Sequence, residues 1–147
     1  MSESLNIIKL AVGIKAIDEL IDRQTLNAHL LSQENHLYNR CFKTRNTPKM
    51  INEIIDSDTG SLYWVVAGKI SLRQKIIGSF NLESQDQKKV CVIGLSDKIF
   101  LTQKIPKRPF QGWRYLKQNE APDDICLYAK QDINNTVLEE LDRLSLL

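Results

Sequence analysis

Aromatic and basic residues occur together in two segments in the middle of this chain. The first is Leu62–Lys75 (LYWVVAGKISLRQK) and the second is Lys107–Leu116 (KRPFQGWRYL). Both tryptophans of the chain lie in these segments, close to a tyrosine and to basic side chains. Indole rings stack on bases and guanidinium groups bond to phosphates, so the pattern predicts recognition of a nucleic acid or another anion. An ordinary core with a charged rim would use the same residue types, and that alternative stays open.

The candidate ligand-binding side chains are basic, amide and aromatic. They are Lys69, Arg73, Gln74, Lys75, Lys107, Arg108, Trp113, Arg114 and Tyr115. Strand alternation predicts one basic face formed by Lys69, Ser71, Arg73 and Lys75. The opposite, mainly apolar face would hold Ile70, Leu72, Gln74 and Ile76. The basic face would contact phosphates or simply be solvated.

The most specific prediction concerns two arginines. Arg73 and Arg114 are expected to converge on one anion, because paired guanidinium groups bind phosphate well. The alternative is that each pairs with a carboxylate, for example Asp123 or Asp124. Trp64 is predicted to be a core indole, in the same layer as Ile70 and Leu72 if no bulge intervenes, and the alternative is that it faces a ligand. Trp113 follows Gly112 and either contacts a ligand or packs over the sheet.

Charge is unevenly distributed along the chain. Residues 61–118 contain 11 Lys and Arg against 3 Asp and Glu, whereas residues 1–60 contain 7 against 8 and residues 119–147 contain 2 against 7. The positive central block favours a polyanionic partner. The alternative is that the acidic tail folds over this block and neutralises it.

Other kinds of chemistry find little support. Cys41, Cys91 and Cys126 form no CxxC pair, and His29 and His36 lack a usual metal spacing, so we expect no metal and no cofactor. GxSxG, P-loop and GxGxxG motifs are absent, which leaves catalysis open. Reduced thiols favour the cytoplasm, and no apolar run approaches the roughly 20 residues of a membrane helix.

The elements that position these residues are expected to be alternating strands and helices at first, followed by a run of consecutive strands. The 147 residues predict one domain, 1–147. Expected in order are a strand at 5–12, a helix at 14–31, a strand at 37–45, a helix from Thr47-Pro48 to Ile54 or Ile55, strands at 62–66, 70–80, 90–95 and 99–105, an edge or loop at 110–116, a strand at 125–129 and a helix from Thr136. Gly68 and Gly78 are expected to mark a bend or bulge between or within the strands. This order predicts an α+β fold with a mainly antiparallel, strongly curved sheet or small barrel and about three helices.

Several strings in the chain resemble a bacterial family of conserved hypothetical proteins, the domain of unknown function numbered fourteen eighty-nine. They are Leu62-Tyr63-Trp64, Arg73-Gln74, Phe110–Leu116 (FQGWRYL), Lys9-Leu10-x-Val12-Gly13, Gly60-Ser61 and Ala121-Pro122-x-Asp124. The resemblance covers almost the whole chain and implies no particular activity. At the level of architecture, the strand run and the Gly68-Lys69 and Arg73 pattern resemble PUA-like barrels of the ASCH type. That resemblance implies binding of RNA or of modified bases.

Three functions follow as hypotheses. The first is a nucleic-acid-binding module, for RNA in preference to DNA, with Trp113 or Tyr115 stacking a base. The second is a pocket or enzyme site for a small phosphorylated or nucleotide-like molecule, lined by Arg73, Gln74, Arg114 and Tyr115. The third is a protein-interaction module whose acidic C-terminal helix is displaced on binding.

Overall fold

The structure is a computed structural model that describes residues 5–31, 38–83 and 89–128. Its elements are β1 (Leu5–Leu10), α1 (Ile17–Leu31), β2 (Arg40–Thr44), α2 (Ile51–Asp56), β3 (Ser61–Val66), β4 (Lys69–Glu83), β5 (Lys89–Pro106), β6 (Trp113–Lys117), a short 3-10 helix (Gln118–Glu120) and β7 (Asp124–Leu127). The predicted α+β class is therefore confirmed. None of the helices in the described ranges is long and apolar enough to cross a membrane.

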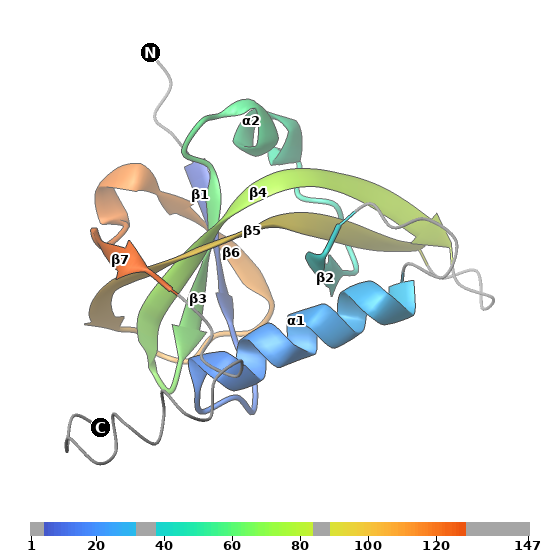
Figure 1. The fold of residues 1–147 in the computed structure, drawn as a ribbon. Coiled ribbons are helices and arrows are strands. Elements are labelled where there is room, and N and C mark those ends of the chain that lie inside the picture. Colours follow the sequence, from blue (N-terminus) through green and yellow to red (C-terminus); the bar gives the residue numbers. More distant parts are fainter. Residues whose placement is uncertain (1–4, 32–37, 84–88, 129–147) are drawn as a thin grey trace.

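The strands form one mostly antiparallel sheet. Its order is β2-β5-β4-β3-β1-β6, and β7 pairs with β5. Only β1 and β3 pair in parallel among these strands. The sheet curves strongly (Figure 1), but β2 and β6 do not pair with each other in the described part of the chain, so the predicted closed barrel is not confirmed. The helix predicted from Thr136 lies outside the described residues.

The β4–β5 hairpin is longer and more continuous than the sequence predicted. Gly78 lies within β4 beside a shift in register, which agrees with the predicted bulge, and β5 joins the two strands predicted at 90–95 and 99–105. Shifts in register between the two strands absorb the extra residues there. Gly78 pairs with Gly94, and a Cβ at either position would overlap the ring of Tyr38. These glycines therefore make room for an aromatic ring instead of ending a strand.

Some element boundaries also differ from prediction. The second helix begins at Ile51, and Thr47 does not cap it, because the Thr47 hydroxyl bonds to the Asn81 side chain at 3.1 Å. Residues 113–117 form an edge strand, which agrees with the predicted edge or loop. The first helix starts at Ile17, with Asp18 and Glu19 in its first turn, where the helix dipole favours negative charge.

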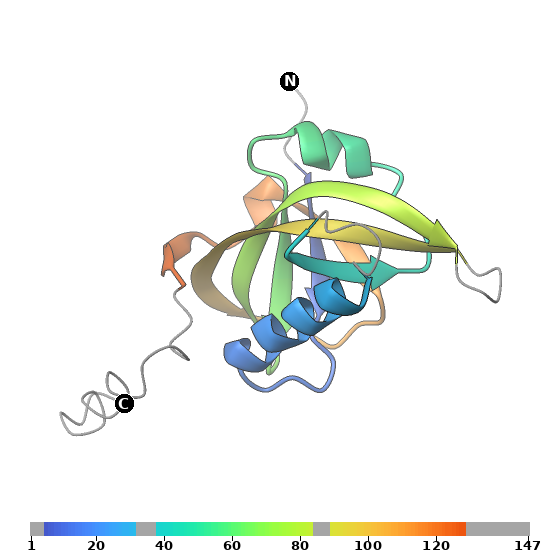
Figure 2. The same cartoon turned by 45° about the vertical axis from the view of Figure 1, so that its right-hand side comes forward.

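Of the three buried apolar clusters in the described residues, the two larger lie on opposite faces of the sheet. The main core joins the strands to α1 and α2, and its members include Ile7, Leu20, Ile21, Phe42, Ile51, Ile54, Leu62, Trp64 and Leu72. In both views the β4–β5 hairpin passes between α2 and α1 (Figures 1 and 2). The smaller core contains Ile8, Tyr63, Val65, Ile70 and Leu116. Trp64 is 4% exposed, so the predicted core indole is confirmed.

A bulge in β4 disrupts the basic face that the sequence predicted for this strand. Arg73 pairs with Tyr63 and Leu72 pairs with Trp64, but the register then shifts, so that Ile70 pairs with Val65. Ser71 is the extra residue. Ile70 therefore joins the Tyr63 core while Leu72 joins the Trp64 core, and strict alternation fails. The expected stripe of four side chains on one face does not exist, because a bulge moves residues before it to the other face.

Candidate functional site

Lys9 of β1 lies between the two tryptophans in a row across the sheet. Its backbone pairs with Trp64 of β3 on one side and with Trp113 of β6 on the other. Directly paired residues point to the same face, so the lysine stem runs beside both indoles on the face of the main core. Apolar neighbours explain how a lysine is accommodated in an otherwise apolar strand, with its amine left to reach outward.

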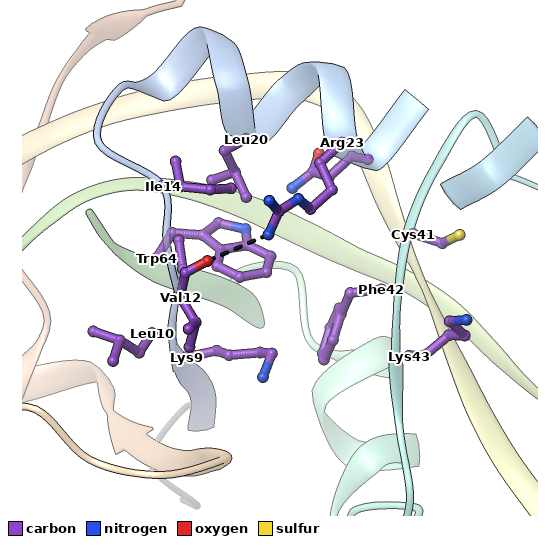
Figure 3. A pocket seen from close by; sticks show the side chains of 12 residues that line it. Lys9, Leu10, Val12, Ile14, Leu20, Arg23, Cys41, Phe42, Lys43 and Trp64 are labelled. Carbon is purple, nitrogen blue, oxygen red and sulfur yellow. Dashed lines mark hydrogen bonds between the residues drawn. The ribbon is translucent and has the colours of Figure 1, made fainter. Parts of the chain in front are cut away.

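An inner cavity of about 250 Å³ opens beside this row. It is lined by Lys9, Leu10, Ala11, Val12, Ile14, Leu20, Arg23, Gln24, Cys41, Phe42, Lys43 and Trp64. Figure 3 shows Arg23 reaching from α1 over Trp64, and Lys9 extending toward Phe42. The Arg23 guanidinium donates to the Val12 carbonyl at 3.3 Å. Aromatic walls and cations therefore surround one space.

An outer cavity of about 410 Å³ lies beside the inner one. Its lining comprises Lys9, Lys43, Thr44, Arg45, Asn46, Gln111, Gly112 and Trp113. The two cavities share Lys9 and Lys43, and we call them together the basic groove. The groove extends from the end of β2 to the beginning of β6, which are the two edges of the open sheet. The gap that keeps the sheet from closing is thus where the groove lies.

The electrostatics of the basic groove are one-sided. The described part of its lining holds four cations, Lys9, Arg23, Lys43 and Arg45, and no Asp or Glu. Among the described residues, Lys9 makes no hydrogen bond or ion pair, and burial lowers its pKa from 10.5. Unpaired cations beside aromatic rings attract an anion that carries a flat, ring-shaped group.

A buried amide network fixes the aromatic wall of the inner cavity. The Trp64 indole N–H donates to Gln74 Oε1 at 2.9 Å, and the amides of Gln24 and Gln74 bond reciprocally at 2.7 and 2.8 Å. Gln74 is fully buried and Gln24 is 2% exposed. Because a buried donor is costly to leave unpaired, this network holds Trp64 in one orientation. Gln74 supports the groove from behind and does not line it.

Arg73 belongs to the opposite face of the sheet. Its guanidinium bonds to both carboxylate oxygens of Asp124, with N–O distances of 2.7 and 2.6 Å, and to Ser61 Oγ at 3.0 Å. It also lies 4.4 Å from the ring centre of Phe100. These contacts raise the pKa of Arg73, chiefly through the bond to Asp124. The carboxylate alternative foreseen for Arg73 is the arrangement observed.

A separate polar cavity of about 250 Å³ lies beside this ion pair. It is lined by Thr59, Tyr63, Arg73, Gln118, Pro122, Asp123 and Asp124. The pKa of Tyr63 is raised, mainly by burial. In contrast to the basic groove, this cavity contains two carboxylates beside its one cation, and its arginine is already engaged.

Arg114 and Arg73 share a face but do not meet. Arg114 pairs with Ile8, Ile8 with Tyr63, and Tyr63 with Arg73. Two strands therefore separate the arginines, which corresponds to about 14 Å along the sheet. Arg114 instead lies over the ring of Phe110, at 5.0 Å from its centre. A shared anion site would need both side chains to leave their present partners.

The remaining predicted residues are distributed around the molecule. Lys75 donates to the carbonyls of Ile55 and Ile76 at 3.2 and 3.0 Å. It therefore provides a hydrogen-bond partner for a carbonyl in the last turn of α2. Lys69 is exposed at the β3–β4 turn. Lys107 and Arg108 are exposed in the segment that precedes Gln111 of the groove. The Tyr115 hydroxyl accepts from the Met50 amide at 3.1 Å, and its ring contacts Trp113 edge-on at 5.0 Å.

Of the predicted residues, the structure therefore places only Trp113 in the lining of the groove. Sequence reasoning missed Lys9, Arg23, Lys43 and Arg45. One signal was available: Lys9 interrupts the apolar run from Leu5 to Val12, where a charged residue needs an explanation. In the described ranges, no cluster of three or more His, Cys, Asp or Glu side chains could hold a metal ion.

The fold and groove define a class: an α+β domain with a cationic groove at the opening of a curved sheet. The chain belongs to the family described as protein of unknown function (DUF1489), whose model matches residues 7–147. The family assignment made from the sequence motifs is thereby confirmed. No curated protein and no solved structure matches the chain significantly.

Proposed function

We propose that this protein is a nucleic-acid-binding module, for RNA in preference to DNA, and that the basic groove is its contact surface. One observation carries the proposal: two adjoining cavities share Lys9 and Lys43, and their described lining residues include four cations and no carboxylate. A groove that continues past a single pocket suits a chain of phosphates. The preference for RNA rests on the resemblance to PUA-like barrels, which is part of the proposal.

The groove offers distinct contacts to backbone and base. Exposed Lys43 and Arg45 would neutralise phosphates along the outer cavity. Trp113, half-buried at the rim after Gly112, would stack one base. Gly112 has a φ of +71°, and nothing lies within 4 Å of where its Cβ would be, so a ligand could approach the backbone closely there.

Salt-dependent binding tests the proposal. We expect single-stranded RNA to bind with a log K against log salt slope of about −3 if the four groove cations each neutralise one phosphate. Lys43→Glu with Arg45→Glu should reduce affinity at least tenfold, since each reversal adds repulsion at the contact surface (about 1.4 kcal/mol in total). Fluorescence anisotropy of labelled single- and double-stranded RNA and of single-stranded DNA would give these affinities.

The matched control is a double reversal outside the groove. Lys69→Glu with Lys104→Glu makes the same change in net charge at two exposed lysines that line neither groove cavity. This control should keep most of the affinity. Equal losses in both double variants would mean that net charge and not the groove determines binding, and no binding by the wild type at micromolar protein would reject the proposal.

A second function, binding of a small phosphorylated or nucleotide-like molecule, is favoured by the inner cavity alone. Its walls include Phe42 and Trp64, whose rings meet edge-on at 5.9 Å, with Arg23 and Lys9 beside them. Such a cavity suits one aromatic ring and one phosphate. Isothermal titration with mononucleotides separates the two functions, because a small-molecule site would bind them as tightly as it binds an oligonucleotide.

A further inference from the structure

Lys9 differs from the other groove lysine in its surroundings. Lys43 is exposed, whereas Lys9 is half-buried between the two strands that carry Trp64 and Trp113. Both lysines line the two cavities, so their difference lies in burial and in neighbouring strands. A cation that only attracts phosphates does not need this position, since surface lysines serve equally well.

The groups that face Lys9 do not stabilise its charged form. Arg23 faces the inner cavity from α1, Lys43 faces both cavities from β2, and β3 and β6 contribute the indoles of Trp64 and Trp113. In the part of the chain that the structure describes, the lining of the groove contains no carboxylate that could pair with the ammonium. Burial lowers the pKa of Lys9, which increases the neutral fraction of its amine at a given pH.

We propose that Lys9 is a nucleophilic amine that forms a reversible imine with a phosphate-bearing aldehyde or ketone held in the basic groove. This activity goes beyond nucleic-acid binding, although it uses the same groove. Amines in apolar or cationic surroundings are the ones that proteins use for this chemistry. Lys43 and Arg23 would hold the phosphate, and the apolar walls would hold the carbonyl carbon near Lys9.

The reaction is balanced without any oxidant or reductant. The Lys9 ammonium first releases a proton to solvent, and the neutral amine then attacks the carbonyl carbon. The carbonyl π electrons move to oxygen, and one proton passes from the attacking nitrogen to this oxygen, which gives a neutral carbinolamine. Loss of the hydroxyl group as water, with release of the remaining N–H proton, forms the C=N bond. Addition of water to the imine reverses every step and returns both partners.

Two sources could supply this ligand chemistry. One is a small carbonyl compound with a phosphate group. The other is an abasic nucleotide within a strand, whose ring-opened sugar presents an aldehyde beside a phosphate. Both place a carbonyl carbon near an anion, which is what the pairing of Lys9 with Lys43 and Arg23 can recognise.

Reductive trapping tests the inference directly. The full chain would be incubated with pyridoxal 5′-phosphate or with a single-stranded oligonucleotide that contains one abasic site, then reduced with sodium borohydride. Peptide mass spectrometry would locate the modified lysines. We expect Lys9 to be the most heavily modified lysine in at least one arm, and excess inorganic phosphate to reduce its modification several-fold.

Two variants and one probe provide the controls. Lys9→Arg keeps the charge but removes the nucleophilic amine, so modification of this position should be lost. Lys69→Arg, at the exposed β3–β4 turn, should leave Lys9 modification unchanged. Pyridoxal without phosphate should modify Lys9 much less. The wild-type distribution is informative by itself, so the test does not depend on the stability of a variant.

Each outcome decides a separate point. Modification of Lys9 by pyridoxal phosphate alone identifies a small ligand, and modification by the abasic strand alone identifies a nucleotide; either supports the inference. Even modification of all exposed lysines, or equal modification of Lys9 by pyridoxal with and without phosphate, overturns it. RNA binding without Lys9 modification rejects only this inference, whereas Lys9 modification without RNA binding rejects only the proposed nucleic-acid function.

Discussion

Arg73 and Gln74 are neighbours on β4, yet they organise two regions with opposite character. Arg73 binds Asp124 on one face, where cation and carboxylate balance. Gln74 points to the other face and hydrogen-bonds to Trp64 in the core. The groove beside Trp64 is lined by four cations and by no carboxylate of the described residues. The comparison shows that a charge in the sequence becomes a binding charge only where the fold leaves it unpaired.

The origin of the groove cations strengthens this lesson. Lys9, Arg23, Lys43 and Arg45 all come from residues 1–60, which contain more acidic than basic residues. The central positive block, by contrast, commits Arg73 to Asp124 and Lys75 to backbone carbonyls. The segment with the greatest positive charge is therefore not the segment that provides most of the basic groove.

Gln74→Leu should have the largest effect on stability, because it removes the buried hydrogen bonds that hold Trp64 beside the groove. The Trp64 indole N–H and the Gln24 amide would both lose their partner in the core, which we expect to lower the free energy of unfolding by about 3 kcal/mol. Urea denaturation would measure this loss. Gln24→Leu is the matched variant, and it should cost less, since Gln74 Oε1 can still accept from Trp64. A Gln74→Leu protein of unchanged stability would contradict the role of this network.

Arg73→Ala should have an intermediate effect on stability and little effect on the groove. It removes a bidentate ion pair whose side chains are 19% and 36% exposed, so solvent screening reduces the expected loss to about 1–2 kcal/mol. Asp124→Asn should cost a similar amount, and the double variant should cost less than the sum. Affinity for RNA should stay within about twofold in Arg73→Ala, since this arginine lies outside the groove. A loss as large as that of the Lys43 and Arg45 reversals would mean that the two regions form one site.

Lys9→Met should have the smallest effect on the free energy of unfolding, and this effect should depend on pH. Burial lowers the pKa of Lys9 below 10.5, so the charged amine destabilises the folded protein at neutral pH. Lys9→Met should therefore be slightly more stable than the wild type at pH 7. As pH rises from the lowered pKa toward 10.5, the unfolded wild type binds more protons than the folded form, and the wild type regains this stability.

Thermal denaturation of both proteins across this range would measure the difference. The advantage of Lys9→Met should be complete below the folded pKa and should disappear as pH passes 10.5. An advantage that is constant with pH would indicate better apolar packing by methionine and not the removal of a desolvated charge.

Much of the fold could be predicted from the sequence because local patterns determine it. Apolar β-branched runs identified the strands, and the spacing of Ile17 and Ile21 identified α1. The family motifs identified the correct relatives. Element boundaries were less accurate, because the end of a helix depends on contacts such as that of Thr47 with Asn81, which are 34 residues apart.

The candidate site was predictable only in part. Trp113 was singled out because it follows Pro109 and Gly112, and it does line the groove. The predicted basic stripe failed because a bulge at Ser71 changes which face the earlier residues occupy. A bulge depends on how two strands align, and strand alternation within one segment does not reveal it.

The sequence by itself determined the types of the elements, the family, the buried position of Trp64 and the glycine-flanked Trp113, since each follows from residue type and local spacing. Only the tertiary structure decided which charges are paired. Arg73 meets Asp124 across 51 residues, and Lys9 meets Trp113 because β1 pairs with β6. Electrostatic interactions depend on distance in space, and burial changes their strength. The basic groove, which is built from β1, β2, α1 and β6, therefore exists only once the sheet has formed.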